Sequence, residues 1–218
     1  MKESKEKSTD AENPRMYLLK ITIEGLPIWR RVAVREDITL GLLHAVIQVV
    51  MGWTNSHLHQ FIIEEVFFSD PRINEDICFD EIPCTDENKT RLMDVVKRTR
   101  SKFAYEYDFG DSWMHVITVE KIVVPEMSPK YFAECLGGEK ACPPEDCGGP
   151  WGYKELLKII QNPSHKEHEG MMEWLGGSFD PNAFDIDKAN TYLHKIKWPR
   201  TTEMQLARVL MARDGYKG

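Results

Sequence analysis

The sequence contains no apolar run near the ~18 residues that a membrane-spanning helix requires. Its longest apolar segment, residues 38–53, is interrupted by His44 and Gln48. The first fifteen residues hold no apolar core of the kind that secretory signals contain. They predict a charged, disordered leader over residues 1–13. We therefore expect a cytoplasmic protein without a membrane partner.

A complete disulfide framework is also missing, because the chain has only five cysteines, an odd number. Positive charge is in deficit: 28 Lys and Arg stand against 35 Asp and Glu, a net charge of −7. This balance argues against non-specific binding to nucleic acid, which needs a basic surface. One basic stretch, Lys89 to Lys102, is a candidate DNA-binding stripe, although such runs usually form a solvated surface.

Several motifs of well-known enzymes are absent too. The sequence has no glycine-rich phosphate loop with its lysine, no nucleophile elbow and no zinc-protease helix. What it does have suits a folded domain, since 42% of its residues are hydrophobic and six are Trp. We expect one domain over residues 14–198 and a C-terminal tail over residues 199–218 with a helical pattern.

The hydrophobic pattern predicts strands first and helices later. Residues 16–25 alternate apolar and polar side chains, and residues 28–34 follow as a second strand of a hairpin. A helix should begin at Asp37 or Thr39 and end at Gly52. Residues 57–68 return to strand character, and residues 103–124 form the strongest hairpin pattern.

Helical patterns dominate beyond residue 150. Residues 164–176 open with a capping-box pattern, Ser164 with Glu167, and Thr202 with Gln205 forms a second one. The predicted class is therefore α+β: an antiparallel sheet with hairpins, covered by helices mostly from the C-terminal half.

The turn of the predicted hairpin carries candidate catalytic groups. Asp108, Asp111 and His115 lie near one hairpin end, and two carboxylates with an imidazole suit a hydrolase or a hard-cation site. Two simpler interpretations compete with this one. Aspartates beside a turn usually bond the local backbone, and His115 alternates with Trp113 and Ile117, as a core residue would.

A second candidate is the stretch of residues 135–153, which is rich in Gly and Pro and predicts a loop. Its Cys135, Cys142 and Cys147 could bind zinc with His115, His165 or His168 as the fourth ligand, but six and four residues separate the cysteines, unlike the usual knuckle. The competing interpretation is a rigid corner in which the thiols fill small apolar spaces. Glu145 and Asp146 next to the thiols argue against a redox role.

Two further motifs complete the candidates. His57 and His59 share a strand face and could chelate a metal, although no nearby ligand completes the set. Trp29 and Arg30, with Arg31, place indole and guanidinium groups close together, where a cation–π contact or an ordinary ion-paired strand can form.

The order of four motifs resembles the plasmid pRiA ORF-3-like family: PIWRR, MGWTNSHLHQF, YDFGDSWMHVITVE and CPPEDCGGPWGY. The resemblance covers residues 15–198. It implies a compact α+β domain and a link to plasmids or mobile elements, and it implies no reaction. The matching positions are Trp29, Arg30, Tyr107, Asp108, Gly110, Asp111, Trp113, His115, Glu145, Asp146, Cys147, Gly148 and Gly149.

These observations favour a small binding module without catalysis, with a protein or a mobile-element component as its partner. Its pocket should form where the hairpin end meets the cysteine-bearing loop, near Asp108, Asp111, His115, Glu145 and Asp146, with Trp29, Arg30, Tyr107 and Trp113 contributing to binding. The alternatives are a metal-dependent phosphodiester hydrolase with His115 as its base, and a weak DNA-binding protein. No cofactor is certain, and zinc is the candidate.

Overall fold

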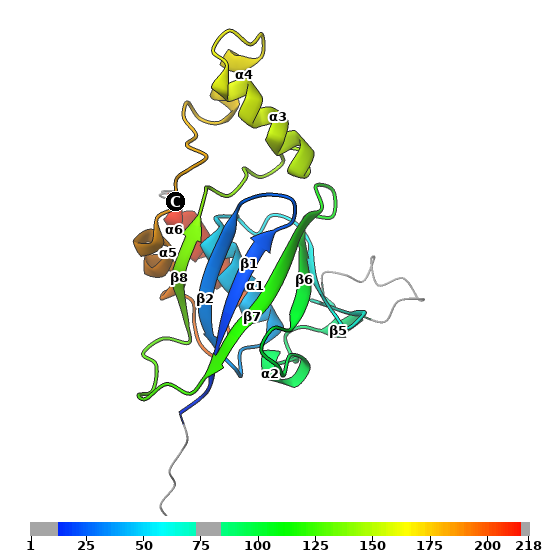
Figure 1. Ribbon diagram of the computed structural model, residues 1–218, viewed down its shortest axis with the longest axis vertical. Coiled ribbons are helices and arrows are strands. Elements are labelled where there is room, and N and C mark those ends of the chain that lie inside the picture. The colour runs from blue at the N-terminus through cyan, green and yellow to red at the C-terminus, as the bar shows by residue number, and fades with distance from the viewer. Residues whose placement is uncertain (1–12, 73–83, 215–218) are drawn as a thin grey trace, which may run out of the picture.

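The computed structural model describes residues 13–72 and 84–214 and has the α+β fold that the sequence predicts (Figure 1). An eight-stranded sheet has the order β5-β4-β3-β6-β7-β1-β2-β8. Every neighbouring pair is antiparallel except β4 with β5. The strands are β1 (Met16–Ile23), β2 (Trp29–Arg35), β3 (His59–Ile63), β4 (Val66–Ser69), β5 (Cys84–Asp86), β6 (Lys102–Tyr107), β7 (Trp113–Val123) and β8 (Ala133–Glu139).

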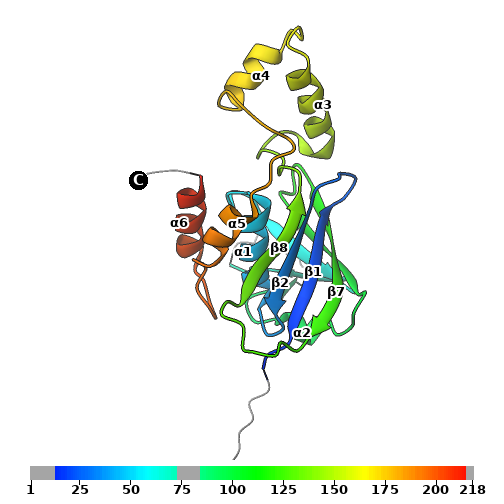
Figure 2. The ribbon, with the colours of Figure 1, turned by 60° about the vertical axis from the view of Figure 1, so that its left-hand side comes forward.

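The helices lie on one face of the sheet or project beyond its end. They are α1 (Leu40–Met51), α2 (Leu92–Val95), α3 (Gly149–Gln161), α4 (His168–Trp174), α5 (Ile186–Leu193) and α6 (Glu203–Arg213). Helix α1 lies between the sheet and the pair α5–α6, and α3 with α4 forms an arm that projects away from the body (Figure 2). None of the helices in the described residues is long and apolar enough to cross a membrane.

The N-terminal half follows its hydrophobic pattern closely. Strand β1 buries Tyr17, Leu19, Ile21 and Ile23, the set that alternation predicts. Helix α1 begins after Thr39, whose side chain accepts a hydrogen bond from the amide of Leu42, and it ends at Gly52 in the left-handed region with a φ of 113°. All of its residues except Gly41 are buried, because the sheet covers one side and other helices the opposite side.

The predicted hairpin is β6 with β7, and it forms the centre of the sheet. Its inward face carries Tyr105, Trp113 and His115, none of them measurably exposed. His115 donates a hydrogen bond from Nδ1 to the carbonyl oxygen of Tyr105 at 3.2 Å. The interpretation of His115 as a core residue is therefore confirmed.

Residues 57–68 have the expected strand character, but they form two strands, because Glu64 and Glu65 adopt left-handed conformations with φ values of 49° and 66° and reverse the chain. Two other local expectations are wrong. The side chain of Ser164 does not cap α4, which begins after Glu167 without a side-chain cap. The Thr202–Gln205 capping box, in contrast, is confirmed.

The stretch 135–153 is not a loop throughout, which is the second correction. Cys135 to Glu139 belong to the edge strand β8, and α3 begins at Gly149. Close packing explains Gly138 in this strand, because a Cβ there would collide with Phe184 and the side chain of Arg30. Only residues 140–148, named the cysteine loop below, are irregular.

Arg30 fixes the start of the cysteine loop from beneath. Its guanidinium is buried and donates to the carbonyl oxygens of Val50 (2.7 Å), Trp29 (2.8 Å), Glu139 (3.0 Å) and Lys140 (2.9 Å). The ring of Phe184 covers it at 4.0 Å. One planar cation thus ties the end of α1 to the end of β8.

We predict that Arg30→Lys lowers the free energy of unfolding by about 2–4 kcal/mol, because an ammonium leaves some of these buried carbonyls unpaired. Arg31→Lys is the matched control, since Arg31 pairs with Glu120 on the open face of the sheet, and it should cost less than about 1 kcal/mol. Urea unfolding followed by tryptophan fluorescence measures both. Equal losses would contradict the role given to Arg30.

Candidate functional site

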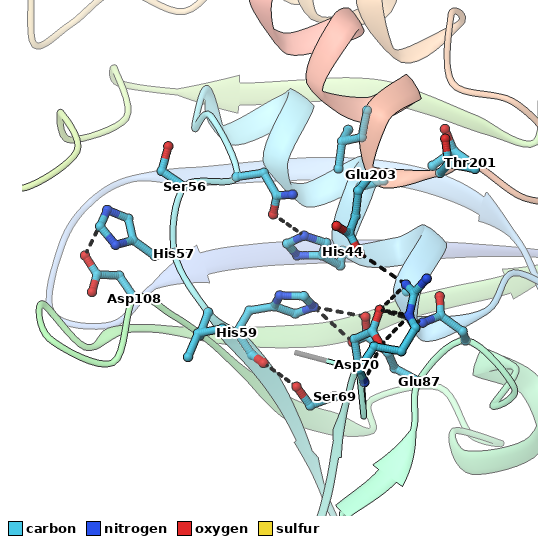
Figure 3. A pocket seen from close by; sticks show the side chains of 18 of the residues that line it. His44, Ser56, His57, His59, Ser69, Asp70, Glu87, Asp108, Thr201 and Glu203 are labelled. Atoms are coloured by element: carbon cyan, nitrogen blue, oxygen red, sulfur yellow. Dashed lines mark hydrogen bonds and ion pairs between the residues drawn. The ribbon is translucent and has the colours of Figure 1, made fainter. Parts of the chain in front are cut away.

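A pocket of about 440 Å³ opens between the edge of the sheet, α1 and the start of α6 (Figure 3). Its lining comes from six parts of the chain that are distant in sequence. The lining residues are Gly41, His44, Ala45, Asn55, Ser56, His57, Leu58, His59, Ser69, Asp70, Arg72, Glu87, Asn88, Asp108, Phe109, Gly110, Thr201, Thr202, Glu203 and Leu206.

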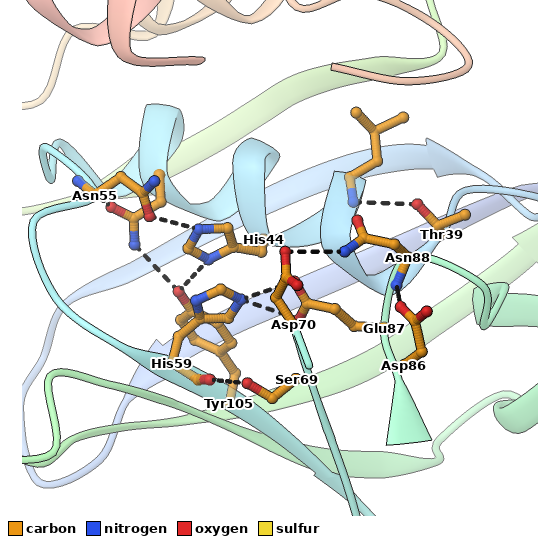
Figure 4. A network of polar contacts seen from close by, with 12 residues as sticks. Thr39, His44, Asn55, His59, Ser69, Asp70, Asp86, Glu87, Asn88 and Tyr105 are labelled. Atoms are coloured by element: carbon orange, nitrogen blue, oxygen red, sulfur yellow. Dashed lines mark hydrogen bonds and ion pairs between the residues drawn. The ribbon is translucent and has the colours of Figure 1, made fainter. Parts of the chain in front are cut away.

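Two stacked imidazoles form the floor of this pocket (Figure 4). The rings of His44 and His59 lie parallel, with centroids 3.4 Å apart. His44 Nε2 donates to Asn55 Oδ1 at 2.7 Å, so its Nδ1 accepts from the hydroxyl of Tyr105 at 2.8 Å. Burial, with the neighbouring His59, lowers the pKa of His44 to about 3. His44 is therefore a neutral platform.

A buried carboxyl group completes the floor behind His59. Both oxygens of Glu87 lie 3.0–3.1 Å from His59 Nε2, and the two residues are 2% and 7% exposed. Burial raises the pKa of Glu87 to about 7 and lowers that of His59 to about 3. When Glu87 is ionised, neutral His59 donates to it from Nε2, which leaves Nδ1 as the acceptor of the ring.

The side of the pocket towards α6 is charged. Arg72 forms a fork with Asp70, and its guanidinium also lies 3.1 Å from Glu203. The hydrogen bonds from Arg72 lower the pKa of Asp70. Arg72 itself is largely exposed, whereas Asp70 is buried and also accepts from Asn88.

The mouth of the pocket gathers three carboxylates around one imidazole. His57 Nε2 lies 3.1 Å from Asp146 Oδ1, 3.6 Å from Asp108 Oδ2 and 3.6 Å from Glu145 Oε2. Tyr107 and Thr54 hold Glu145 in place, because the Tyr107 hydroxyl, the Thr54 amide and the Thr54 hydroxyl all donate to Oε1.

The cysteine loop is seated directly on the tip of the β6–β7 hairpin. The amide of Gly148 donates to Asp111 Oδ2 at 3.1 Å, and Trp53 Nε1 donates to the carbonyl of Pro143 at 3.2 Å. Gly149 has a φ of 68°, and a Cβ there would collide with the carbonyl oxygen of Asp111. The structure thus places Asp108, Asp111, Glu145 and Asp146 together, as the sequence-based pocket requires.

The other predicted site residues lie elsewhere. His115 is beneath the pocket, edge-on to Trp53, and burial lowers its pKa to about 4. Trp113 is in the core, and Trp29 on the open face of the sheet donates to Glu139. Of the four residues expected to contribute to binding, only Tyr107 touches the mouth, while Arg30 supports the loop from below.

The cysteines do not form a ligand set in the described part of the chain. Cys135 is in the edge strand β8, and Cys142 and Cys147 pack against the core from the loop. Burial raises the pKa of all three thiols, that of Cys147 to about 12. Among the described residues, one group of three could hold a metal ion: His57, Asp108 and Asp146. Each offers one ligand atom, and these three atoms lie within 4.8 Å of one another.

Sequence reasoning missed His44, Asp70 and Glu87. A signal for His44 was available, because His44 and Gln48 are four residues apart and share one face of an otherwise apolar helix. Polar side chains on a buried helix need partners, and Gln48 indeed donates to Tyr105 and accepts from the amide of Asn55. Glu87 follows an acidic segment, and no pattern sets it apart from its neighbours.

We predict that Glu87→Gln stabilises the fold most at alkaline pH. The folded protein binds the Glu87 proton more tightly than the unfolded chain, so stability is lost as pH rises from about 4.5 through about 7. A glutamine carries no charge and escapes this loss. Thermal unfolding should show a gain near pH 8 and little change near pH 4.5. A variant destabilised at both pH values would contradict the assignment.

We also predict that Gly149→Ala releases the cysteine loop. The new methyl group meets the Asp111 carbonyl at a left-handed position, which costs about 1 kcal/mol or more. Amide hydrogen exchange at Gly148 and Thr54 should accelerate. Gly170→Ala, in α4 with open space around it, is the control and should leave both rates unchanged.

Comparison with known proteins agrees with the fold. Residues 15–188 match the family described as plasmid pRiA4b ORF-3-like protein. The uncharacterised protein y4hQ of Sinorhizobium fredii (strain NBRC 101917 / NGR234) is 37% identical over 190 residues, which cover 84% of this chain and 93% of the relative. The crystal structure of MM3350, a protein of unknown function from Methanosarcina mazei Go1, gives a TM-score of 0.69 at 34% identity over 80% of this chain and 97% of that chain.

Proposed function

The chain belongs to the plasmid pRiA4b ORF-3-like family, and we propose that it is a binding module whose pocket takes a small molecule with a positively charged group. The resemblance seen in the motifs is thus confirmed. The names of its relatives state no activity, so the proposal rests on the residues that line the pocket. The expected protein or mobile-element partner and the cytoplasmic location stay predictions.

The observation that carries the proposal is the buried polar floor. Six polar residues that line the pocket, on its floor, side and mouth, are more than nine-tenths buried: His44, His59, Ser69, Asp70, Glu87 and Asp108. Burying such groups costs free energy even when they are hydrogen-bonded, and an apolar floor of the same shape would be more stable. Polar groups fixed in a concave site are typical of ligand recognition.

The charge of the lining selects the ligand. Asp70, Glu87, Asp108 and Glu203 supply four carboxyl groups, and Arg72 supplies one guanidinium. Since His44 and His59 are held neutral, the lining is acidic once Glu87 is ionised. An ammonium or guanidinium group gains from this field, and a phosphate group is repelled. A phosphodiester and duplex DNA are both negatively charged, so neither matches the acidic lining of this pocket.

Putrescine, a four-carbon diamine, and succinate, a dicarboxylate of the same length, form a matched pair of probes. We predict saturable putrescine binding and no succinate binding by titration calorimetry in the presence of EDTA. Glu87→Gln should weaken putrescine binding roughly tenfold, since a charge-assisted hydrogen bond is lost. Glu106→Gln, outside the pocket and bonded to Gln60 and Ser112, is the control. Two outcomes contradict the proposal: succinate binds as tightly as putrescine, or neither molecule binds.

The affinity for putrescine should rise between pH 6 and pH 8. Glu87 loses its proton near pH 7, so the carboxylate that attracts a cation forms over this interval. In Glu87→Gln the same titration should be nearly flat. A wild-type affinity that falls with rising pH would show that the bound group is not held by this carboxylate.

A further inference from the structure

The mouth of the pocket places three potential metal ligands from three separate segments around one point. They are His57 ahead of β3, Asp108 at the hairpin tip and Asp146 in the cysteine loop, and one ligand atom of each lies within 4.8 Å of the other two. Ligand atoms about 2.0–2.5 Å from a common ion are separated by at most about 4–5 Å. One ion can therefore reach all three with small side-chain adjustments.

The surrounding hydrogen bonds leave one oxygen of Asp108 free. Asp108 Oδ1 accepts from the amides of Gly110 and Asp111, while Oδ2 faces His57 and has no hydrogen-bond donor among the described residues. Glu145 is held more fully, because three donors converge on Oε1 and the Tyr107 hydroxyl also donates to Oε2, which lies 3.6 Å from His57 Nε2. Such outer contacts orient the ligands of metal sites.

Burial makes this geometry significant. The Asp108 side chain is 10% exposed, and His57 Nε2 is buried and makes no hydrogen bond, although Asp146 Oδ1 lies 3.1 Å from it. Buried polar atoms in native proteins are almost always satisfied. A buried nitrogen that makes no hydrogen bond and faces carboxylate oxygens indicates that a further partner belongs between them.

The charges indicate that this partner is a cation. Asp108, Glu145 and Asp146 form no ion pair with a lysine or arginine within the described ranges 13–72 and 84–214. A proton on His57 Nε2 can point at only one oxygen at a time, which leaves two carboxylates uncompensated. An ion with two positive charges binds several of them at once.

We propose that His57, Asp108 and Asp146 bind a divalent transition-metal ion at the pocket mouth, with Glu145 beside it. One imidazole among carboxylates suits Mn²⁺ or Zn²⁺ better than Mg²⁺ or Ca²⁺, which prefer oxygen ligands alone. This site goes beyond the proposed binding of a cationic molecule, because it uses the mouth, whereas that ligand is held by Glu87 at the floor.

The test is a titration of EDTA-treated, dialysed protein with Mn²⁺, followed by calorimetry and by the EPR signal of free Mn²⁺. We expect one saturable site. Asp146→Asn should weaken it at least about tenfold, and His57→Gln similarly, as ligand loss does. Asp146 is 71% exposed at its side chain, so its substitution spares the fold. Asp187→Asn, an exposed carboxylate on α5, is the matched control.

Two results overturn the site: no saturable Mn²⁺ binding by the wild-type protein, or binding that survives both Asp146→Asn and His57→Gln. Glu87→Gln separates this proposal from the preceding one. It should weaken putrescine binding and leave the Mn²⁺ affinity within about twofold, because Glu87 contacts none of the proposed ligands and distant sites act independently. Loss of Mn²⁺ binding in Glu87→Gln would contradict a separate mouth site.

Discussion

The seating of the cysteine loop on the tip of the β6–β7 hairpin is the contact on which the site depends. The Asp111 carboxylate accepts a hydrogen bond from the amide of Gly148, and the absence of a side chain at Gly149 lets the two backbones approach. Arg30 fixes the start of the same loop by holding the carbonyls of Glu139 and Lys140. Without this seating, Glu145 and Asp146 would not reach His57, and the pocket would have no mouth.

Beneath the mouth, the protein combines an apolar core with a polar floor. The sheet and α1 bury an almost continuous set of aliphatic and aromatic side chains. Along one line through this core, His44, Gln48 and Tyr105 are joined by hydrogen bonds, and His59 stacks on His44. Such a network costs desolvation but fixes each ring in one orientation. Pre-organised groups of this kind lower the ordering cost of ligand binding.

Local sequence patterns predicted most of the fold. Alternation predicted β1 and the β6–β7 hairpin, and capping rules predicted both ends of α1, because these signals reside within a few consecutive residues. The edge strand β8 was missed, since Gly137 and Gly138 are typical of loops, and the packing of Phe184 and Arg30 against Gly138 is a tertiary contact that no local pattern shows. The meeting of loop and hairpin could be inferred from polar residues near element ends. The partnership of His59 with Glu87 could not, because 28 residues separate them and no periodicity links them.

The proposed cation site requires that the loop and the hairpin together form the mouth of the pocket. Crystals grown with Mn²⁺ and measured at the manganese absorption edge test this directly. We expect one anomalous peak between the His57 imidazole and the Asp108 and Asp146 carboxylates, about 2.0–2.3 Å from its ligand atoms. A cysteine loop turned away from the hairpin tip, or a seated loop with no peak at this position, would contradict it.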